Sequence, residues 1–331
     1  MKNIKIPLLW LLASVLTLSG ASVQNQSVEK VFGSSPPMNY LLYAINPNKM
    51  IGLNFSVKNE NNSADTHYLK QSFLELPVIG SFHGSGNGMN VETIIKYSPD
   101  LILVWEDDYL STKVTQAIAQ THIPTLTLPF RKIESMADSI QKAADAMGES
   151  KRGRDLSSYT KERLGHIKKT IHPLTPVRYY YAEGNDALAT ECSDSFHVEA
   201  LNYAGGKNVH NCTQSNLQGL ERITFEQLLI YDPDVIVVQN RAVLSAIENN
   251  PLFAHLRAVK EKRVYLAPNT PFHWLDRPPS FMRIIGIEWL ASKFHPEHYD
   301  GDIYKQIAEF FALFLDVKLS KNEIEKILGE K

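Results

Sequence analysis

Two stretches of the sequence decide the fold: residues 89–104 read MNVETIIKYSPDLILV, and residues 223–238 read ITFEQLLIYDPDVIVV. They align without a gap and share Glu, Tyr and Pro-Asp at equivalent positions. Each contains a helix-capping residue, Asn90 or Thr224, followed by apolar residues at helical spacing. Pro-Asp then ends the helix, and the apolar run after it is typical of a buried parallel strand. Any α/β protein contains such units, but the shared residues favour one helix–turn–strand unit in each half of the chain.

Other segments support two α/β lobes with central, mostly parallel, Rossmann-like sheets. In the first half, periodicity and turn residues predict strands at 49–55, 77–82 and 123–128 and a helix at 112–121. In the second half they predict strands at 177–182 and 263–267, with helices at 195–204 and 253–259. A helical region is expected over 281–328.

The stretch between the halves, residues 133–171, contains little Pro or Gly and predicts two helices broken near Gly148. The second helix, about 151–171, would join the lobes directly and limit hinge motion. We therefore expect a signal peptide at 1–21, an N-terminal lobe at 22–148, a linker helix at 149–172 and a C-terminal lobe at 173–331.

The N-terminus has the pattern of a secretory signal peptide. Lys2 and Lys5 precede an apolar run over residues 6–18, and small residues follow it. The run is too short for the ~20 apolar residues of a spanning helix. Residues 18–21 resemble a lipobox, but Ala21 replaces the acylated Cys. We expect a protein of the bacterial periplasm without a lipid anchor.

The composition and the absence of catalytic motifs indicate which classes of partner and activity to exclude. The 331 residues include 34 Lys and Arg against 36 Asp and Glu, for a formal net charge of -2. A nucleic-acid-binding protein normally has a basic excess, so we expect no nucleic-acid partner. The chain also lacks the G-x-S-x-G, H-E-x-x-H and P-loop motifs. These features predict a monomeric binding protein, not an enzyme, with no intrinsic cofactor.

Three further segments carry a family resemblance: ATECSDSFH at 189–197, AGGKN at 204–208 and TPFHWLDRPPSFM at 270–282. With the repeats and the helical connector, they resemble the periplasmic binding proteins of ABC importers for iron–siderophore, haem and cobalamin, the class III or helical-linker family. The similarity is nearest to a sub-branch for iron(III) or nickel chelates. It implies capture of a metal chelate in an interlobe cleft and delivery to an inner-membrane permease dimer. Haem, cobalamin and a bare transition-metal ion remain alternatives.

Ligands of open α/β sheets bind beyond the carboxyl ends of the strands. Aromatic and cationic residues in the loops at these positions could hold a flat or anionic complex. No histidines have strong ligand spacing, so we expect the protein to supply at most one or two metal ligands. The candidate ligand-binding residues are Phe82, His83, Trp105, Arg241, Trp274 and Arg277, and the candidate metal ligands are His83 and His197.

The sequence also suggests roles for two pairs of residues, one in docking and one in a disulfide. Glu92 and Glu226 occupy equivalent positions in the repeats, and the family resemblance implies that they dock on the two permease subunits. Stabilisation of the helix dipole would also explain both carboxylates. If oxidised, Cys192 and Cys212 would close a loop of about 20 residues, which a periplasmic location permits.

Overall fold

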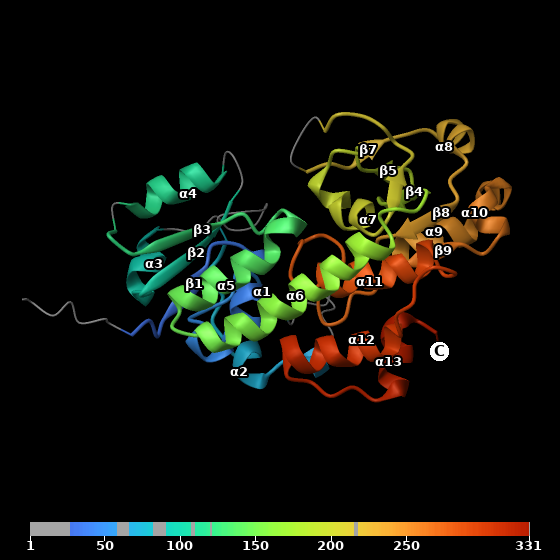
Figure 1. Ribbon diagram of the computed structural model, residues 1–331. Helices are drawn as coiled ribbons and strands as arrows, with labels where there is room; N and C mark the ends of the chain where they lie inside the picture. Colours follow the sequence, from blue (N-terminus) through green and yellow to red (C-terminus); the bar gives the residue numbers. More distant parts are fainter. Residues whose placement is uncertain are drawn as a thin grey trace, which may run out of the picture.

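The computed structural model describes residues 27–57, 66–81, 91–106, 110–119, 121–214 and 218–330. Two separate parallel sheets define two lobes, and the 21-residue helix α6 (Ser150–Thr170) runs between them (Figure 1). This is the predicted α/β fold of two lobes joined by a helix. The predicted signal peptide lies outside the described residues. Within the described ranges, no helix is both long and apolar enough to cross a membrane.

Each lobe is built on one parallel sheet. The first has the order β1-β2-β3, and the second has the order β6-β4-β8-β9. A short antiparallel pair, β5 and β7, lies beside the second sheet. The strands are β1 (Val31–Gly33), β2 (Leu101–Trp105), β3 (Thr125–Leu128), β4 (Val177–Ala182), β5 (Ala189–Thr190), β6 (Gly206–Asn208), β7 (Glu221–Arg222), β8 (Val235–Val238) and β9 (Val264–Leu266).

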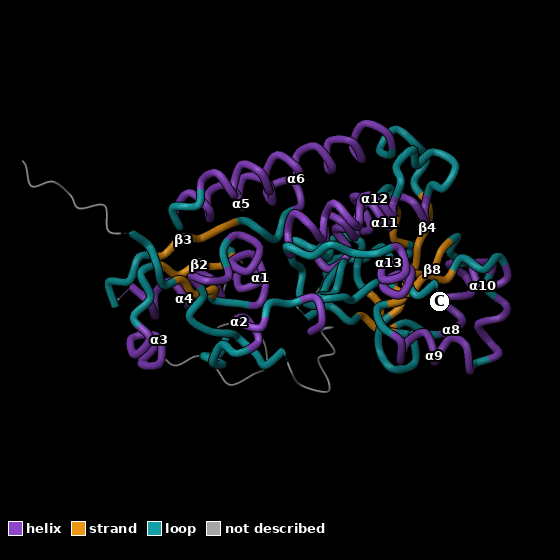
Figure 2. The backbone as a smooth tube through the Cα atoms, turned by 90° about the horizontal axis from the view of Figure 1, so that it is seen from below, coloured by secondary structure: helices purple, strands orange, loops and turns teal. Residues whose placement is uncertain are grey.

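Helices cover both sheets (Figure 2). In Figure 2, α5 and α6 run along one side of the molecule, while α3 and α8 lie on the opposite side, one on each lobe. Besides α6, the helices of the described residues are α1 (Pro36–Ile45), α2 (Gln71–Leu74), α3 (Val91–Tyr97), α4 (Leu110–Ala119), α5 (Met136–Ala146), α7 (Glu199–Tyr203), α8 (Phe225–Tyr231), α9 (Arg241–Asn249), α10 (Arg257–Lys260), α11 (Arg283–Phe294), α12 (Ile303–Phe310) and α13 (Lys321–Leu328).

The structure confirms the sequence repeat, and the two copies also share a backbone conformation at the end of the helix. Helix α3 leads into β2, and α8 leads into β8. Each helix ends at a residue with positive φ: 45° at Ser98 and 37° at Asp232. This left-handed conformation is uncommon outside glycine, and a single residue there turns the chain out of the helix. The same turn therefore connects helix to strand in both lobes.

The repeated Pro-Asp also has the same role in both lobes. The Asp100 carboxylate accepts hydrogen bonds of 2.9 Å from the backbone N–H groups of Glu29 and Lys30. Likewise, Asp234 accepts a 3.0 Å hydrogen bond from the backbone N–H of Arg178. The donors lie just before or at the start of a neighbouring parallel strand, β1 or β4. Each aspartate thus fixes the start of the strand that follows it against the start of the neighbouring parallel strand.

The helical connector is as predicted. Helices α5 and α6 are separated at Gly148, whose φ of 76° ends the first helix. Leu156, Leu164 and Ile167 of α6 lie in the core, and the opposite face of the helix is polar. Helix α6 therefore packs with one face against the hydrophobic core.

Two predicted strands are not regular strands. Residues 49–55 and 77–81 form isolated bridges, such as Val31↔Met50 and Leu53↔Val78, and not continuous strands. The Asn54 side chain donates 2.9 Å hydrogen bonds to the carbonyl oxygens of Gly33 and Gly80. A side chain thus satisfies carbonyls that a continuous ladder would otherwise occupy. The predicted helix 195–204 is also divided, into a 3₁₀ turn (Phe196–Val198) and α7.

The hydrophobic core is continuous between the lobes. One cluster of buried side chains includes Leu103 of β2, Tyr179 of β4 and Phe310 of α12. The Tyr40 ring of the first lobe stacks on Phe272 of the second, with centroids 3.8 Å apart. Separating the lobes would expose these apolar surfaces to water, which costs about 25 cal/mol per Å². The packing therefore favours limited relative motion.

The C-terminal helical region packs against the first lobe. Arg152 of α6 donates to the carbonyl oxygen of Ala44, at 2.9 Å, and to that of Leu313, at 2.6 Å. Lys70 and Asp316 form an ion pair of 3.0 Å. The C-terminal region thus contacts both the linker helix and the first lobe. The domain boundaries given above stay predictions.

Candidate ligand-binding site

The carboxyl ends of strands from the first sheet meet the second lobe. Trp105 is the last residue of β2, and its ring lies edge-on to Phe196, with centroids 5.9 Å apart. Arg131, which follows β3, places its guanidinium carbon 5.4 Å from the centre of the Phe196 ring. Loops beyond the carboxyl ends of strands are where α/β proteins bind ligands. We call Trp105, Arg131 and Phe196 the interlobe patch.

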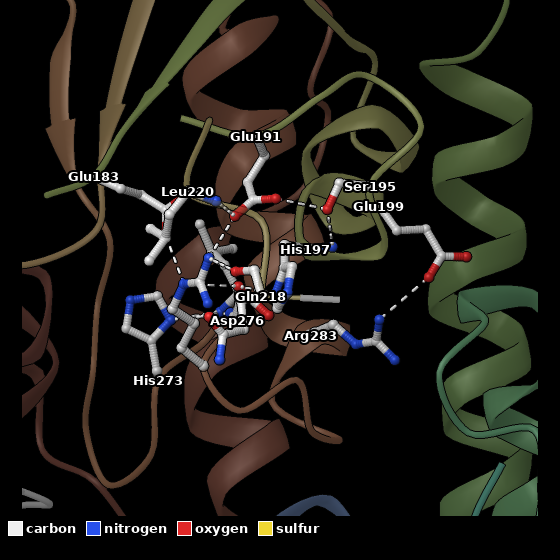
Figure 3. Close-up of polar contacts among 12 residues, drawn as sticks. Glu183, Glu191, Ser195, His197, Glu199, Gln218, Leu220, His273, Asp276 and Arg283 are labelled. Carbon is white, nitrogen blue, oxygen red and sulfur yellow. Dashed lines mark hydrogen bonds and ion pairs between the residues drawn. The ribbon is translucent and has the colours of Figure 1, made fainter. Parts of the chain in front are cut away.

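Beside this patch, an ion pair of the second lobe, between buried Arg283 and half-buried Glu199, also bonds to the backbone of the first lobe. Arg283 donates to Glu199 at 3.2 Å and to the carbonyl oxygen of Phe130 at 2.7 Å. The other oxygen of Glu199 accepts a 3.0 Å hydrogen bond from the backbone N–H of Ile133. Figure 3 shows Arg283 extending toward Glu199. These charge-assisted hydrogen bonds fix how the loop after β3 sits on the second lobe.

A group of buried charges, drawn in Figure 3, lies next to the interlobe patch, because the ring of its member His197 lies 3.9 Å from the Phe196 ring, centre to centre. The side chains of Glu183, Glu191 and Asp276 are all fully buried around the guanidinium of Arg277. Arg277 Nε lies 2.6 Å from Glu183 and 3.6 Å from Asp276, while Nη2 pairs with Glu191. Nδ1 of His197 lies 2.6 Å from Asp276. We call these five residues the carboxylate cluster.

Three separate segments build the carboxylate cluster. Glu183 directly follows β4, and Glu191 directly follows β5, while Asp276 lies in the loop between β9 and α11. Glu191 also accepts hydrogen bonds from Ser195 Oγ, at 2.8 Å, and from the backbone N–H of Leu220, at 3.1 Å. A Cβ on Gly219 would lie 2.0 Å from a Glu191 oxygen, so only glycine fits there.

Burial and neighbouring charges shift the pKa values of three residues in this cluster. Burial raises the pKa of Glu183 to about 8, although the Arg277 charge opposes the shift. Burial alone would lower the pKa of His197, but the Asp276 charge and hydrogen bond outweigh it, so that pKa is raised. Burial would raise the pKa of Asp276, yet pairing with His197 leaves it lowered. Near neutral pH the cluster therefore retains a proton on Glu183.

These shifts predict a pH dependence of stability. Between the unfolded pKa of Glu, about 4.3, and the folded value of Glu183, the native state binds more protons than the unfolded state. The free energy of unfolding should therefore fall as pH rises from 5 to 8, by at most about 1.4 kcal/mol per pH unit from this group. The raised pKa of His197 acts in the same direction. Glu183→Gln should reduce the slope in urea unfolding.

Glu261→Gln is the matched control, because Glu261 is exposed in a turn outside the cluster. It should leave the pH dependence unchanged. An unaltered slope in Glu183→Gln would show that the Glu183 proton does not contribute.

One predicted binding residue belongs to the core. Trp274 is fully buried, its Nε1 donates to the carbonyl oxygen of Thr270 at 2.8 Å, and its ring packs near Phe311. The prediction that Trp274 stacks on a ligand is therefore wrong in this structure. Its replacement by Ala would act first on folding, because a buried aromatic side chain would be lost.

The remaining predicted ligand-binding and metal-binding residues that the structure describes do not all lie in one place. Arg277 lies among carboxylates, so it does not present the unpaired positive charge that would favour an anionic ligand. Arg241 is exposed as the first residue of α9. His197 lies in the carboxylate cluster, and its role as a metal ligand stays a prediction. Phe82 and His83 lie outside the described residues.

Sequence reasoning missed Glu183, Arg131 and Phe196. Glu183 gave a usable signal, because a carboxylate directly follows an apolar strand there. Arg131 follows a short predicted strand in the same way. Phe196 gave no comparable signal, because its segment is irregular. The predicted pair Cys192 and Cys212 is joined by a disulfide.

Comparison with known proteins defines the class. Residues 63–271, more than half of the chain, match the family described as periplasmic binding protein. A solved ABC transporter solute binding protein from Sulfurospirillum deleyianum is 35% identical with a TM-score of 0.87, covering 92% of this chain and 95% of that one. The chain belongs to the periplasmic binding protein family, as a non-enzymatic solute-binding component of an ABC importer.

Relatives within the family have different named ligands. The molybdate-binding protein MolA of Haemophilus influenzae is 24% identical over 261 residues, covering 70% of this chain and 71% of the relative. The vitamin B12-binding protein of Vibrio vulnificus is 20% identical over 283 residues, covering 86% and 96%. Family membership therefore does not select the ligand.

Proposed function

We propose that this protein captures a metal complex between its lobes in the periplasm and delivers it to an inner-membrane permease dimer. The observation that carries this proposal is the interlobe patch, where strand ends of the first sheet meet Phe196 of the second lobe. The named ligands of the two relatives, molybdate and vitamin B12, both hold their metal within non-protein atoms. This chemistry supports a ligand that arrives already coordinated.

The side chains at the boundary suit the organic part of such a complex. Phe196 offers an aromatic face, and the guanidinium of Arg131 beside it can donate to carboxylate or catecholate oxygens. Arg241, exposed as the first residue of α9, is a second candidate cation in the second lobe. We favour an iron(III)–siderophore or a nickel chelate. Haem, cobalamin and a bare metal ion are the alternatives that a ligand measurement would reveal.

The arrangement of metal-binding side chains supports a chelated ligand over a bare cation. In the described part of the chain, the one group of three His, Cys, Asp or Glu side chains close enough to share an ion is Cys192, His210 and Cys212. Its cysteines form a disulfide in this structure. A bare divalent cation needs three or four converging ligands. The chelator would therefore supply most of the coordination, with His197 as a candidate protein ligand.

We propose that Glu92 and Glu226 dock the two lobes on the permease. Both are exposed in the first turn of a helix, α3 or α8. A hydrogen bond from its own backbone, and another from Thr224, lower the pKa of Glu226, so it is anionic at neutral pH. These helices lie on the same side of the molecule, opposite α6 (Figure 2). One two-fold symmetric partner can therefore meet both carboxylates.

Charge reversal of both glutamates should abolish uptake while leaving the ligand bound. The double variant Glu92→Arg/Glu226→Arg places cations where we expect arginines of the permease, and like charges at an interface oppose association. We expect an unchanged thermal midpoint, to within a few degrees, and unchanged ligand occupancy. Uptake by cells that depend on this protein is the measurement.

Glu248→Arg is the matched control, because Glu248 is also exposed on a short helix, α9. It should transport normally. Normal uptake by the double variant would leave the two carboxylates with only their stabilising effect on the helices.

A further inference from the structure

A second group of chemically reactive side chains lies outside the interlobe patch. Cys192 follows β5, while His210 and Cys212 lie in the loop after β6. One potential ligand atom from each of these residues lies within 4.8 Å of the other two. Cys192 is buried, and the other two residues are half-buried, so solvent reaches part of the group. Two sulfurs and one imidazole are a ligand set typical of zinc sites.

The loops that carry these residues are held together by contacts other than the disulfide. Ser193 Oγ donates to Asn211 Oδ1 at 2.8 Å. The backbone N–H of Gln214 donates to Asp194 Oδ1 at 2.9 Å. Each hydrogen bond joins a neighbour of Cys192 to a neighbour of Cys212. Breaking the sulfur–sulfur bond would therefore leave two thiols facing each other on loops that stay in place.

The third side chain is also oriented by the fold. The backbone N–H of His210 donates to Asn208 Oδ1 at 2.9 Å, which fixes the residue just beyond β6. Its Nδ1 lies 2.9 Å from the Tyr231 hydroxyl at the end of α8. Metal-bound histidines usually have such an outer hydrogen bond, which fixes the ring orientation. Tyr231 can serve this purpose while the other ring nitrogen binds a metal.

We propose that reduction of the Cys192–Cys212 disulfide converts this group into a site for one borderline or soft divalent cation such as Zn²⁺. A dithiol reductant supplies two electrons and two protons, the sulfur–sulfur bond breaks, and the reductant becomes a disulfide. Metal binding then displaces one proton from each thiol. In a tetrahedral site the sulfurs would be roughly 3.8 Å apart, which small side-chain rotations provide. His210 is the third ligand, and water fills the fourth position.

This site is separate from the proposed transport ligand, because it uses none of the interlobe patch residues. The oxidised protein, with its disulfide intact, would transport its ligand whether or not the reduced form binds a metal. Failure of one proposal is therefore distinguishable from failure of the other.

Cobalt titration of the reduced protein tests the proposal. The full-length protein is reduced with a phosphine, freed of reductant under nitrogen and titrated with Co²⁺, while the oxidised protein is titrated in parallel. We expect a one-to-one complex with a thiolate-to-cobalt charge-transfer band, which the oxidised protein lacks, and displacement of the cobalt by Zn²⁺. His210→Gln should weaken binding by about tenfold or more. His255→Gln, at an exposed histidine in the 3₁₀ helix Pro251–His255, should leave it unchanged.

Three results would overturn the proposal. The first is reduced protein that binds Co²⁺ no more tightly than the oxidised form. The second is a His210→Gln variant with the same affinity and spectrum as the native chain, which would remove the imidazole from the site. The third is loss of native circular dichroism on reduction, because the site requires the two loops to stay in place without the disulfide.

Discussion

Replacing Arg277 with Met should lower the free energy of unfolding by about 3–5 kcal/mol, the largest effect on stability that we expect from a single charge. The substitution leaves Glu183, Glu191 and Asp276 buried without their central cation. Removing one partner of a buried ion pair leaves desolvated charge uncompensated. Arg277 also has a φ of 55°, an uncommon conformation that its ion pairs help to hold. Urea unfolding at pH 7 measures the loss.

An exposed arginine pair provides the matched control for this result. Arg222 donates to both oxygens of Asp186, at 2.7 and 2.6 Å, but solvent reaches both side chains. Its replacement by Met should cost less than about 1 kcal/mol, because water screens the pair. Equal losses for the two arginine variants would contradict the account of the carboxylate cluster.

Phe196→Ala should weaken ligand binding by about 2 kcal/mol, or roughly thirtyfold in Kd. The Phe196 ring is half-buried at the lobe boundary, where it contacts both Trp105 and the guanidinium of Arg131. Truncation removes the apolar face on which we place the complex and lets water between the lobes. Competition between the native and variant proteins for a limited amount of ligand measures the difference.

Phe225→Ala is the control, because Phe225 is also half-buried but packs against Phe253 in the second lobe. It should lose stability without losing ligand affinity. A similar drop in affinity for both variants would show that general destabilisation, and not contact with the ligand, is responsible.

Local sequence patterns were sufficient for the repeat. The helix–turn–strand units follow from caps, apolar spacing and Pro-Asp within each unit. The positive φ at Ser98 and Asp232 shows that this local chemistry has one structural result in both lobes. For the same reason, the break between α5 and α6 at Gly148 was predictable.

The candidate site depends on contacts distant in the sequence, and local patterns do not determine those. Trp274 looks like a binding residue in its loop, yet packing near Phe311 places it in the core. The carboxylate cluster joins Glu183 to Arg277, 94 residues apart. Sequence alone identified Arg277 as a cation near a strand end but gave no indication that carboxylates surround it.

Native mass spectrometry of the protein purified from the periplasm tests capture between the lobes most directly. We predict a one-to-one complex with a small molecule whose mass and isotope pattern reveal a metal. Occupancy should fall sharply in Phe196→Ala and stay unchanged in Phe225→Ala. A bound species that persists at equal occupancy in both variants would contradict binding at the interlobe patch, and a protein that carries only bare metal ions would contradict capture of a preformed complex.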